Sequence, residues 1–428
     1  MISAVLFLSF FVFLIMGIPI SICLGLSSVC AILYSGTSLT IVATNMYSGI
    51  SKFLLLAIPF FVLSGNIMAK AGISRRLINF VNTCVGHRRG GIAIVCVIVA
   101  CFFGAISGSG PATVAALGCV LIPAMIQQGG FSAPFSTALM ATASSIAIVI
   151  PPSIAFVVYA SITGVSIADM FMGGIVPGIL MGLALVIVVM IEARKNNIQG
   201  SMKKASGAER WAAFKDAFWG LLMPVIILGG IYGGIFTPME AAAVAIFYGL
   251  FVGTFIYKTF NSWDKLLHVL FESVKATAVI MFVVTCAGLF AWVASTVGLV
   301  ERGAAVLLAL SDNPWALLFL INVILLAAGM IMDAISIYYV LLPFLLPIVH
   351  HFAWDPVWFG VMMTENLAVG QVTPPVAVNL YVGAQIVDLT MEEMTPPVIP
   401  LLLATLVALA VIVLFPGLST FLPTLWGL

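Results

Sequence analysis

Four short stretches combine poor helix formers with oxygen-bearing side chains inside otherwise apolar runs. They are residues 107–111, 144–152, 332–334 and 366–375. Glycine, serine and proline disfavour a helix interior, so each stretch predicts a break in which backbone N–H and C=O groups are left unpaired. Freed carbonyls and hydroxyls are hard oxygen ligands for a cation, whereas exposed helix N-termini favour an anion. These residues therefore point to ion binding.

Asp333 is the sharpest single candidate for such a site. It stands in the centre of the apolar run 315–350, where a carboxylate is costly unless it faces water or a cation. We expect it to be a sodium ligand that is joined by nearby carbonyls and hydroxyls. The alternative is an acid at the end of a helical hairpin that reaches the membrane surface.

Two further acids have less specific positions. Glu365 lies about two turns into its helix, and it is either a structural partner within the bundle, which we favour, or a proton carrier. Glu240 follows Thr237-Pro238 at a predicted helix start, where a carboxylate caps the helix and meets its dipole. We therefore expect Glu240 to be a cap.

Hydroxyl and amide side chains gather near the same breaks. A hydroxyl in a helix commonly bonds to its own backbone. Because these hydroxyls cluster at corresponding breaks, we consider ion binding and backbone bonding as equal alternatives. The side chains that offer a hydroxyl as an ion ligand are those of Ser107, Ser109, Ser144, Ser145 and Thr373. Ser153 and Asn379 follow the two Pro-Pro pairs, and we expect them to be substrate contacts.

Motifs of common enzymes do not occur. The sequence holds no HExxH, no GxSxG and no Walker-type glycine-rich loop. The four histidines are predicted to lie at interfaces, away from the breaks. We expect a protein that is not an enzyme, that has no nucleic-acid partner, and whose pumping, if any, is secondary.

The composition defines the elements that must position these residues. The chain has 428 residues, of which 63% are hydrophobic and 7% charged, with a mean hydropathy of +1.25. This predicts an all-α polytopic membrane protein with about ten to twelve spans.

The chain also contains an internal duplication. IPPSIAFVVY (150–159) pairs with TPPVAVNLYV (373–382), and IVPGIL (175–180) pairs with VIPLLL (398–403) at the same offset. Each half is predicted to hold five spans and one re-entrant hairpin. The first repeat covers 1–192, with a hairpin at 91–127 and a broken helix at 131–163. After a basic linker at 193–215, the second repeat covers 216–428, with an arm helix at 259–273, a hairpin at 315–350 and a broken helix at 358–387.

The distribution of basic residues predicts how the two halves are oriented. Residues 70–89 are expected to form a basic loop. The regions 70–89, 192–215 and 258–275 together hold 14 of the 16 Lys and Arg residues, leaving Lys52 and Arg302. The positive-inside rule places these three regions in the cytoplasm. An odd number of spans per half then makes the repeats inverted, with both termini outside. Inverted repeats with matching breaks are typical of a transporter that binds its substrate near the bilayer midplane.

Five motifs give the chain a full-length resemblance to the large membrane subunit of TRAP (tripartite ATP-independent periplasmic) transporters. One departure is mild, because Met239 stands where many members have a hydroxyl residue. The motifs are IPFFVLSGNIMAKAGI (58–73), FGAISGSGPATVAALG (103–118), IPPSIAFVVYASI (150–162), GIFTPMEAAAVAIFYG (234–249) and VTPPVAVNLYV (372–382).

The resemblance implies a fold of the ion-transporter type with an elevator mechanism in a bacterial inner membrane. It implies a separate small four-helix membrane subunit, a periplasmic binding protein that delivers an organic anion, and two or more sodium ions that drive uptake. The anion would lie between the two hairpin tips. The implied sodium ligands are Ser107, Gly108, Ser109, Gly110, Ser144, Ser145, Asp333, Ala334, Gln371 and Thr373, and the implied substrate contacts are Ser109, Pro111, Pro152, Ser153, Pro375 and Asn379.

Other functions stay open from the sequence. One is a stand-alone sodium- or proton-coupled dicarboxylate carrier of the same fold class. Another is an anion channel or membrane scaffold, although a channel would want rings of charge. The substrate cannot be read from these residues, and overall resemblance alone leans toward a sialic acid over a C4-dicarboxylate.

Overall fold

The protein is helical throughout the part of the chain that the computed structural model describes, residues 1–200 and 204–426. Lys203 of the predicted linker lies outside these residues. Eight of the described helices are long and apolar enough to cross a membrane, and several shorter apolar helices accompany them. The predicted class, an all-α polytopic membrane protein, is confirmed at this level.

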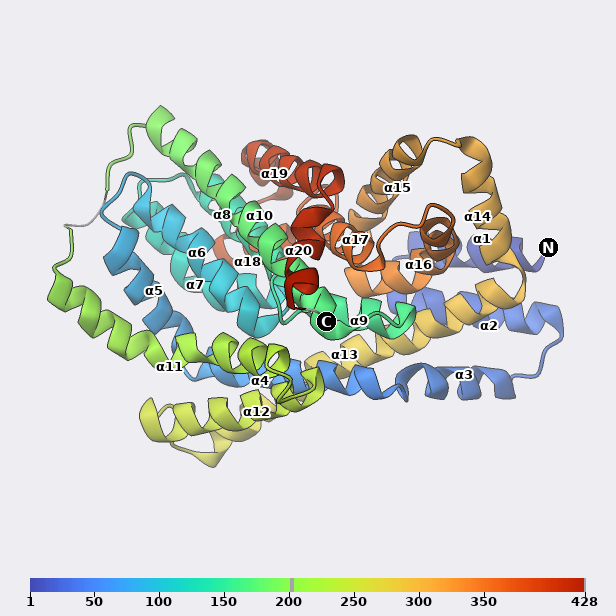
Figure 1. Cartoon of the computed structure of the whole chain (residues 1–428), viewed down its shortest axis with the longest axis horizontal. Coiled ribbons are helices and arrows are strands. Elements are labelled where there is room, and N and C mark those ends of the chain that lie inside the picture. The colour runs from blue at the N-terminus through green and yellow to red at the C-terminus, as the bar shows by residue number, and fades with distance from the viewer. Residues whose placement is uncertain (201–203, 427–428) are drawn as a thin grey trace.

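The first half of the chain begins with two short helices and ends with one of the longest (Figure 1). Its elements are α1 (Ile2–Ile15), α2 (Ile20–Ser35), α3 (Thr40–Ile50), the 3-10 helix η1 (Phe53–Leu56), α4 (Ala57–Lys70), α5 (Ile73–Val85), α6 (Gly91–Ser107), α7 (Gly110–Gln127), α8 (Ala133–Ser145), the 3-10 helix η2 (Ile146–Ile148), α9 (Ile154–Thr163) and α10 (Ile167–Lys195).

The second half has a similar order of lengths. Its elements are α11 (Gly207–Tyr232), α12 (Pro238–Phe251), the π-helix η3 (Val252–Ile256), α13 (Trp263–Thr296), α14 (Leu299–Leu310), α15 (Pro314–Gly329), α16 (Ala334–His351), α17 (Pro356–Gly370), α18 (Val378–Val387), α19 (Met391–Leu414) and α20 (Gly417–Trp426).

The break between α6 and α7 is short and has a local cause. Gly108 ends α6 with φ 61°, a left-handed conformation that glycine adopts without a Cβ penalty. Ser109 is extended, and Pro111 stands in the first turn of α7, where its missing N–H costs nothing. Two antiparallel helices thus meet at a two-residue turn over the residues predicted as a hairpin, 91–127.

The second half has a corresponding turn. α15 ends at Gly329, and Asp333 begins α16 as its N-cap. The Pro-Pro pairs also fall at corresponding places, because Pro151-Pro152 precedes α9 and Pro374-Pro375 precedes α18. Both pairs contain a cis bond.

Three elements differ from the sequence prediction. The region 70–89, predicted as a basic loop, contains the amphipathic helix α5, whose apolar Ile73, Leu77 and Val81 are buried. The arm predicted at 259–273 is not a separate helix, because α13 runs unbroken for 34 residues. No glycine or proline interrupts it before Gly288, so nothing in the local sequence ends the arm.

The linker predicted at 193–215 is also shorter than expected. Its basic ends are helical, since α10 continues to Lys195 and α11 begins at Gly207. Ser206 and Glu209 form a capping box that starts α11, with Glu209 Oε2 accepting from the Ser206 N–H at 2.7 Å. This local cap therefore starts the helix at Gly207, whereas the composition predicted that the linker would continue to residue 215.

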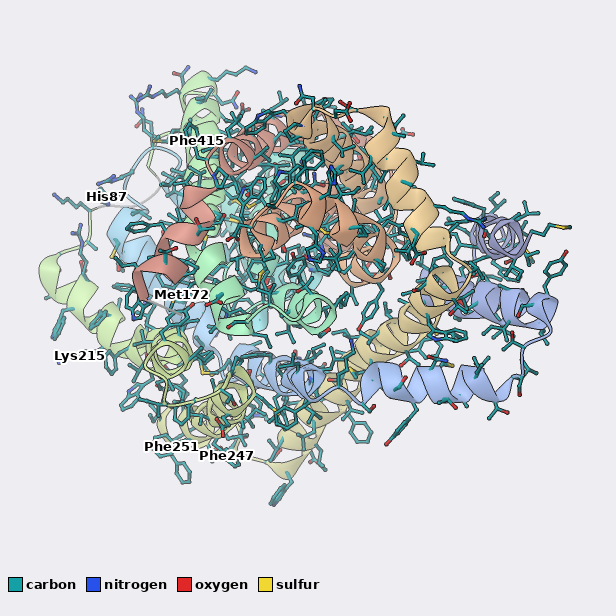
Figure 2. The ribbon with its side chains drawn as sticks, turned by 45° about the vertical axis from the view of Figure 1, so that its right-hand side comes forward. His87, Met172, Lys215, Phe247, Phe251 and Phe415 are labelled. Atoms are coloured by element: carbon teal, nitrogen blue, oxygen red, sulfur yellow. The ribbon has the colours of Figure 1, made fainter. Side chains whose placement is uncertain are left out.

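Aromatic side chains project outward from the rim of the molecule. Phe247 and Phe251 of α12 point away from the helices behind them (Figure 2) and are 73% and 50% exposed. Such exposed aromatics would be unfavourable in water and suit a lipid environment. Behind the rim, α13 crosses the molecule against α2, α3, α4 and α16.

Candidate functional site

A cavity of about 360 Å³ lies where the two turns approach each other, and we call it the tip cavity. One side is formed by the turn between α6 and α7, and another by the start of α16. It is lined by Gly108, Ser109, Gly110, Pro111, Ile148, Ile154, Ala155, Val279, Ile280, Val283, Asp333, Ala334, Ile335 and Gln371. Seven of these were predicted from the sequence, namely Gly108, Ser109, Gly110, Pro111, Asp333, Ala334 and Gln371.

The first turn is held closely against the break before α9. A Cβ atom on Gly108 would lie 2.9 Å from the Pro152 carbonyl oxygen, so only glycine fits here. Within the turn, Ser107 Oγ and Thr113 Oγ1 are 2.8 Å apart and hydrogen-bonded. Thr113 Oγ1 also donates to the Ser109 carbonyl at 2.8 Å. Ser107 and Pro152 therefore support the turn, while neither lines the tip cavity.

Gly110 brings the first half into contact with the last break of the second half. A Cβ atom at Gly110 would lie 2.9 Å from Gln371 Oε1 and 3.0 Å from Asn379 Oδ1. Both oxygens are buried and accept no hydrogen bond from any described residue. The Asn379 amide nitrogen donates to the Ala141 carbonyl at 3.4 Å, and both atoms of the amide group lie beside Gly110. Two orphaned amide oxygens thus converge at the N-terminus of α7.

Asp333 acts as a helix cap and also lines the tip cavity. Its Oδ2 accepts from the backbone N–H groups of Ile335 at 3.0 Å and Ser336 at 3.2 Å. Its Oδ1 accepts from Ser336 Oγ at 2.5 Å. The cap accounts for this carboxylate without requiring a metal, but a carboxylate has about four lone-pair sites and the cap uses three of them. The sodium-ligand interpretation therefore stays a prediction.

The other predicted hydroxyls are bonded to their own segments. Ser144 Oγ donates to the Ala141 carbonyl at 2.6 Å, and Ser145 Oγ donates to that of Thr142 at 2.8 Å. Thr373 Oγ1 donates to the Val369 carbonyl at 2.7 Å. These contacts fit the backbone-bonded alternative, although each oxygen can still accept or coordinate.

The predicted substrate contacts separate into two groups. Ser109 and Pro111 line the tip cavity, and buried Asn379 adjoins it through Gly110. Ser153 is turned inward, where its hydroxyl donates to the Ile148 carbonyl and accepts from the Phe156 N–H. Pro375 lies exposed in the break between α17 and α18 and does not line the cavity.

The two remaining acids have different outcomes. Glu240 forms a capping box with Thr237, because Glu240 Oε2 accepts from the Thr237 N–H at 2.8 Å, and the predicted cap is confirmed. Glu365 is fully buried in α17, and neither carboxyl oxygen has a hydrogen-bond partner among the described residues. The structural partner that we favoured from the sequence is therefore missing in the described part of the chain.

One wall of the tip cavity consists of residues that the sequence did not single out. Val279, Ile280 and Val283 of α13 face the cavity opposite the turns. Their helical spacing was visible, but an apolar stripe in an apolar span carries no functional signal. Only packing of α13 against α4 and α16 reveals this wall.

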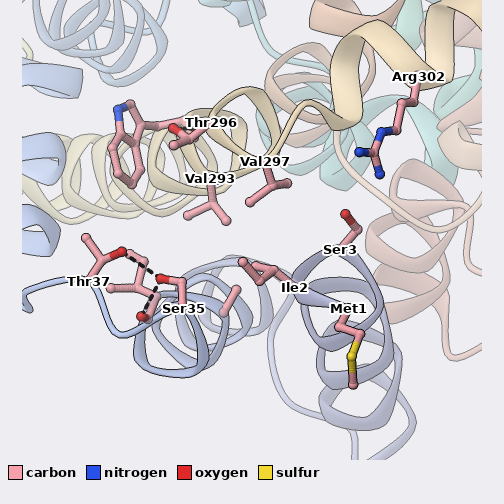
Figure 3. Close-up of a pocket in the computed structure, with 12 residues that line it drawn as sticks. Met1, Ile2, Ser3, Ser35, Thr37, Val293, Thr296, Val297 and Arg302 are labelled. Carbon is pink, nitrogen blue, oxygen red and sulfur yellow. Dashed lines mark hydrogen bonds between the residues drawn. The ribbon is translucent and has the colours of Figure 1, made fainter.

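A separate cavity, of about 540 Å³, lies beside the chain's N-terminal helix (Figure 3). Arg302 and Ser3 project into it from opposite sides, and Ser35 and Thr37 share a hydrogen bond of 2.7 Å at its edge. It contains none of the predicted site residues. The tip cavity at the breaks is therefore the better candidate for the functional site.

The oxygen atoms around the tip cavity suit sodium better than a transition metal. Gln371 Oε1 and Asn379 Oδ1 are buried and unpartnered, and the Asp333 carboxylate lies at the opposite turn. The described residues form no group of three or more His, Cys, Asp or Glu side chains that could hold a metal. Neutral oxygens with a single carboxylate match a hard monovalent cation, so the donor set fits the predicted ion.

Comparisons with known proteins agree with this architecture. The C4-dicarboxylate TRAP transporter large permease protein DctM of Rhodobacter capsulatus is 38% identical, with 96% of each chain covered. The sialic acid TRAP transporter large permease protein SiaM of Vibrio cholerae is 37% identical over 92% of each chain. The isethionate TRAP transporter permease protein DctMQ of Oleidesulfovibrio alaskensis is 40% identical, covering 97% of this chain and 66% of its own length.

The fold also has a distant solved counterpart. The YdaH transporter of Alcanivorax borkumensis superposes with a TM-score of 0.63 at 18% identity, covering 89% of this chain and 90% of that one. The model of the tripartite ATP-independent periplasmic transporter family, DctM component, matches residues 7–418. The chain therefore belongs to the DctM family of TRAP transporter large permease subunits, multi-pass membrane proteins that are not enzymes.

Proposed function

We propose that this chain is the sodium-coupled membrane subunit through which an organic anion enters the cell. The observation that carries the proposal is the tip cavity, where Gln371 Oε1 lies unpartnered beside Gly110 and near Asp333. Sodium at these oxygens would add positive charge to a cavity that lacks a lysine or arginine among the described residues. An anionic group could then bind between the two turns, where the N-terminus of α7 also favours it.

The order of the helices supports an inverted repeat. α6 to α9 and α15 to α18 follow one another with similar lengths, and both series end in a Pro-Pro break before a ten-residue helix. Together with the positive-inside rule, this arrangement supports our proposal that both termini lie in the periplasm. We propose that the two hairpins and broken helices move together against α13 and the outer helices, as in an elevator.

The names of the relatives bear on partners and substrate. The relatives include proteins named for C4-dicarboxylate, sialic acid and isethionate, all of which are organic acids. We therefore propose an organic acid as the substrate, delivered by a periplasmic binding protein. The isethionate relative, whose name joins M and Q, extends well beyond the matched region. A separate small membrane subunit is the corresponding partner here.

Uptake by reconstituted protein tests this function. Proteoliposomes would contain this chain and its small membrane subunit, with the periplasmic binding protein outside. The probes are succinate, isethionate and N-acetylneuraminate, each with and without an inward sodium gradient. We expect one probe to accumulate only when both sodium and the binding protein are present.

Other outcomes would replace the proposal. Accumulation without the binding protein or small subunit would favour a stand-alone carrier. Accumulation that depends on a proton gradient and not on sodium would show that the coupling ion is a proton. Equilibration of the anion with no accumulation would favour a channel, in which binding sites conduct without coupling.

A further inference from the structure

A second cavity, of about 350 Å³, lies beside the tip cavity. Both cavities are lined by Ser109, Ile154 and Ile280, so they share one wall. From there the second cavity runs between α4 and α13 to Lys70 and Glu272. We call it the Lys70 cavity. Together the two cavities outline a path from the tip turns to a basic side chain that the sequence did not link to the breaks.

Two polar contacts between α4 and α13 border this path. Lys70 Nζ lies 3.2 Å from Glu272 Oε2, and one turn earlier on α4 the Asn66 amide donates to Ser273 Oγ at 2.9 Å. The Lys70 and Glu272 side chains are 48% and 41% exposed. A pair this exposed is worth only about 0–1 kcal/mol, so a competing anion can displace Glu272 at little cost.

A third cavity, of about 620 Å³, meets the Lys70 cavity at Lys70 itself. Lys258, Lys265 and His268 also line it, together with one acid, Asp264. His268 Nδ1 lies 3.5 Å from Glu272 Oε1. Clustered lysines raise the local concentration of anions. The basic end lies on the side that the charge distribution predicts to be cytoplasmic.

We propose that Lys70 forms a second anion subsite, at which the carboxylate or sulfonate group of the substrate replaces Glu272 after it leaves the tip cavity. The inference rests on the proposed function for the identity of the anion. In this subsite Lys70 Nζ donates to the anion, with the Asn66 amide within the same cavity. Glu272 then tunes the release of the anion, because its carboxylate competes for the same ammonium group.

Charged thiol reagents can test the subsite without knowledge of the substrate. Ala112 and Ala115 are exposed on α7 and line the Lys70 cavity, so each would be replaced singly by cysteine. Exposed Cys119 would be changed to serine first. Anionic 2-sulfonatoethyl and cationic trimethylammonioethyl methanethiosulfonate would be added to vesicles that present the predicted cytoplasmic face. Peptide mass spectrometry would give the ratio of anionic to cationic labelling rates.

Two substitutions should change the ratio of labelling rates in opposite directions. In Lys70→Gln the ratio should fall about tenfold, because attraction of the anion and repulsion of the cation are lost together. In Glu272→Gln it should rise about threefold, because Lys70 loses its partner. Lys265→Gln is the matched control, since Lys265 lines only the outer basic cavity, and its ratio should stay within about twofold of the unsubstituted value.

A ratio that stays unchanged in Lys70→Gln, or that falls as far in Lys265→Gln, would overturn the subsite. If Lys70→Gln does not assemble, Glu272→Gln decides alone, and an unchanged ratio there also overturns it. The labelling requires no transport. If uptake fails but the labelling ratio depends on Lys70, the proposed function is contradicted. If uptake is normal but the ratio does not depend on Lys70, only this inference is contradicted.

Discussion

Gly110 and Asn379 lie so close that a Cβ atom on the glycine would stand 2.8 Å from the Asn379 amide nitrogen. This contact joins the first turn of α7 to the first turn of α18, which are far apart in the sequence. It places the N-terminal break and the last break in a single polar cluster. The candidate site is thus built from both halves of the chain.

Gly110→Ala should therefore impair transport. The added methyl group would meet the ends of the Asn379 and Gln371 side chains, which are buried and have little room to move away. Because these atoms belong to side chains and not to backbone, we expect a cost at the low end of the about 1–3 kcal/mol that overpacking takes. If the loss falls on the transport-competent state, uptake should drop about tenfold. Gly49→Ala in α3 is the control, because no atom lies within 4 Å of its Cβ position. Equal uptake by the two variants would show that the cluster tolerates expansion.

Asp333 offers a way to separate capping from ion binding. Asparagine can still cap α16 through its side-chain oxygen, whereas alanine cannot, so Asp333→Ala should lose about 1 kcal/mol of stability and Asp333→Asn much less. If Asp333 also binds sodium, both variants should raise the sodium concentration that gives half-maximal uptake. Thermal unfolding and sodium titrations of uptake would measure the two effects.

The control for that experiment is Asp355→Asn. Asp355 caps α17 through the Trp358 N–H at 2.8 Å but does not line the tip cavity. It should unfold like Asp333→Asn and keep the original sodium dependence. An unchanged sodium dependence in Asp333→Ala would leave this residue as a cap only.

The breaks were predictable because their causes are local. The hairpin expected at 91–127 corresponds to α6 and α7, which occupy the same residues and turn at Gly108. Glycine, proline and capping side chains act on their own backbone, so their effect is visible in a short window of sequence. Glu240 is a further example, since its capping box needs only Thr237 three residues earlier.

The contacts between breaks could not be predicted in this way. Nothing near Gly110 indicates that Asn379 will be its neighbour, and nothing in α13 indicates that Val279 faces a cavity. Charge patterns misled where an amphipathic helix and a loop look alike, as in α5. Long-range packing decides these features, and a single sequence carries little trace of it.

The bond between Asn366 and Asn322 should stabilise the packing of α17 on α15. The Asn366 amide donates to Asn322 Oδ1 at 2.8 Å and to the Asn322 backbone carbonyl at 3.0 Å. Asn366→Ala should cost about 1 kcal/mol, in the range of hydrogen bonds between membrane helices. Asn322→Ala should cost less, because the backbone acceptor remains.

A double-mutant cycle would measure this coupling. The variant that carries both changes should lose less stability than the sum of the two single losses, since either single change already removes the bond between the side chains. Replacing Asn322 also removes its amide bond to the Leu318 carbonyl at 2.9 Å, so the double variant should be somewhat less stable than Asn366→Ala. Exposed Asn79 of α5 gives the control substitution to alanine. Additive losses from the two single variants would contradict a direct bond.

Glu365 decides between the two roles that the sequence left open. It is fully buried, and neither of its carboxyl oxygens is bonded to a described residue. A carboxylate anion in such a place would cost several kcal/mol, so the fold favours the neutral acid.

Glu365→Gln has nearly the same volume and no charge, and it leaves no described partner unsatisfied. We expect sodium-driven uptake within about twofold of the unsubstituted protein, because an isosteric change in a core costs little. Glu365→Ala should lose about 2–4 kcal/mol of stability through the cavity that it leaves. Uptake assays at several pH values, together with thermal unfolding, would measure both variants. Loss of uptake in a well-folded Glu365→Gln protein would contradict the expectation and indicate that the exchangeable proton of Glu365 takes part in transport.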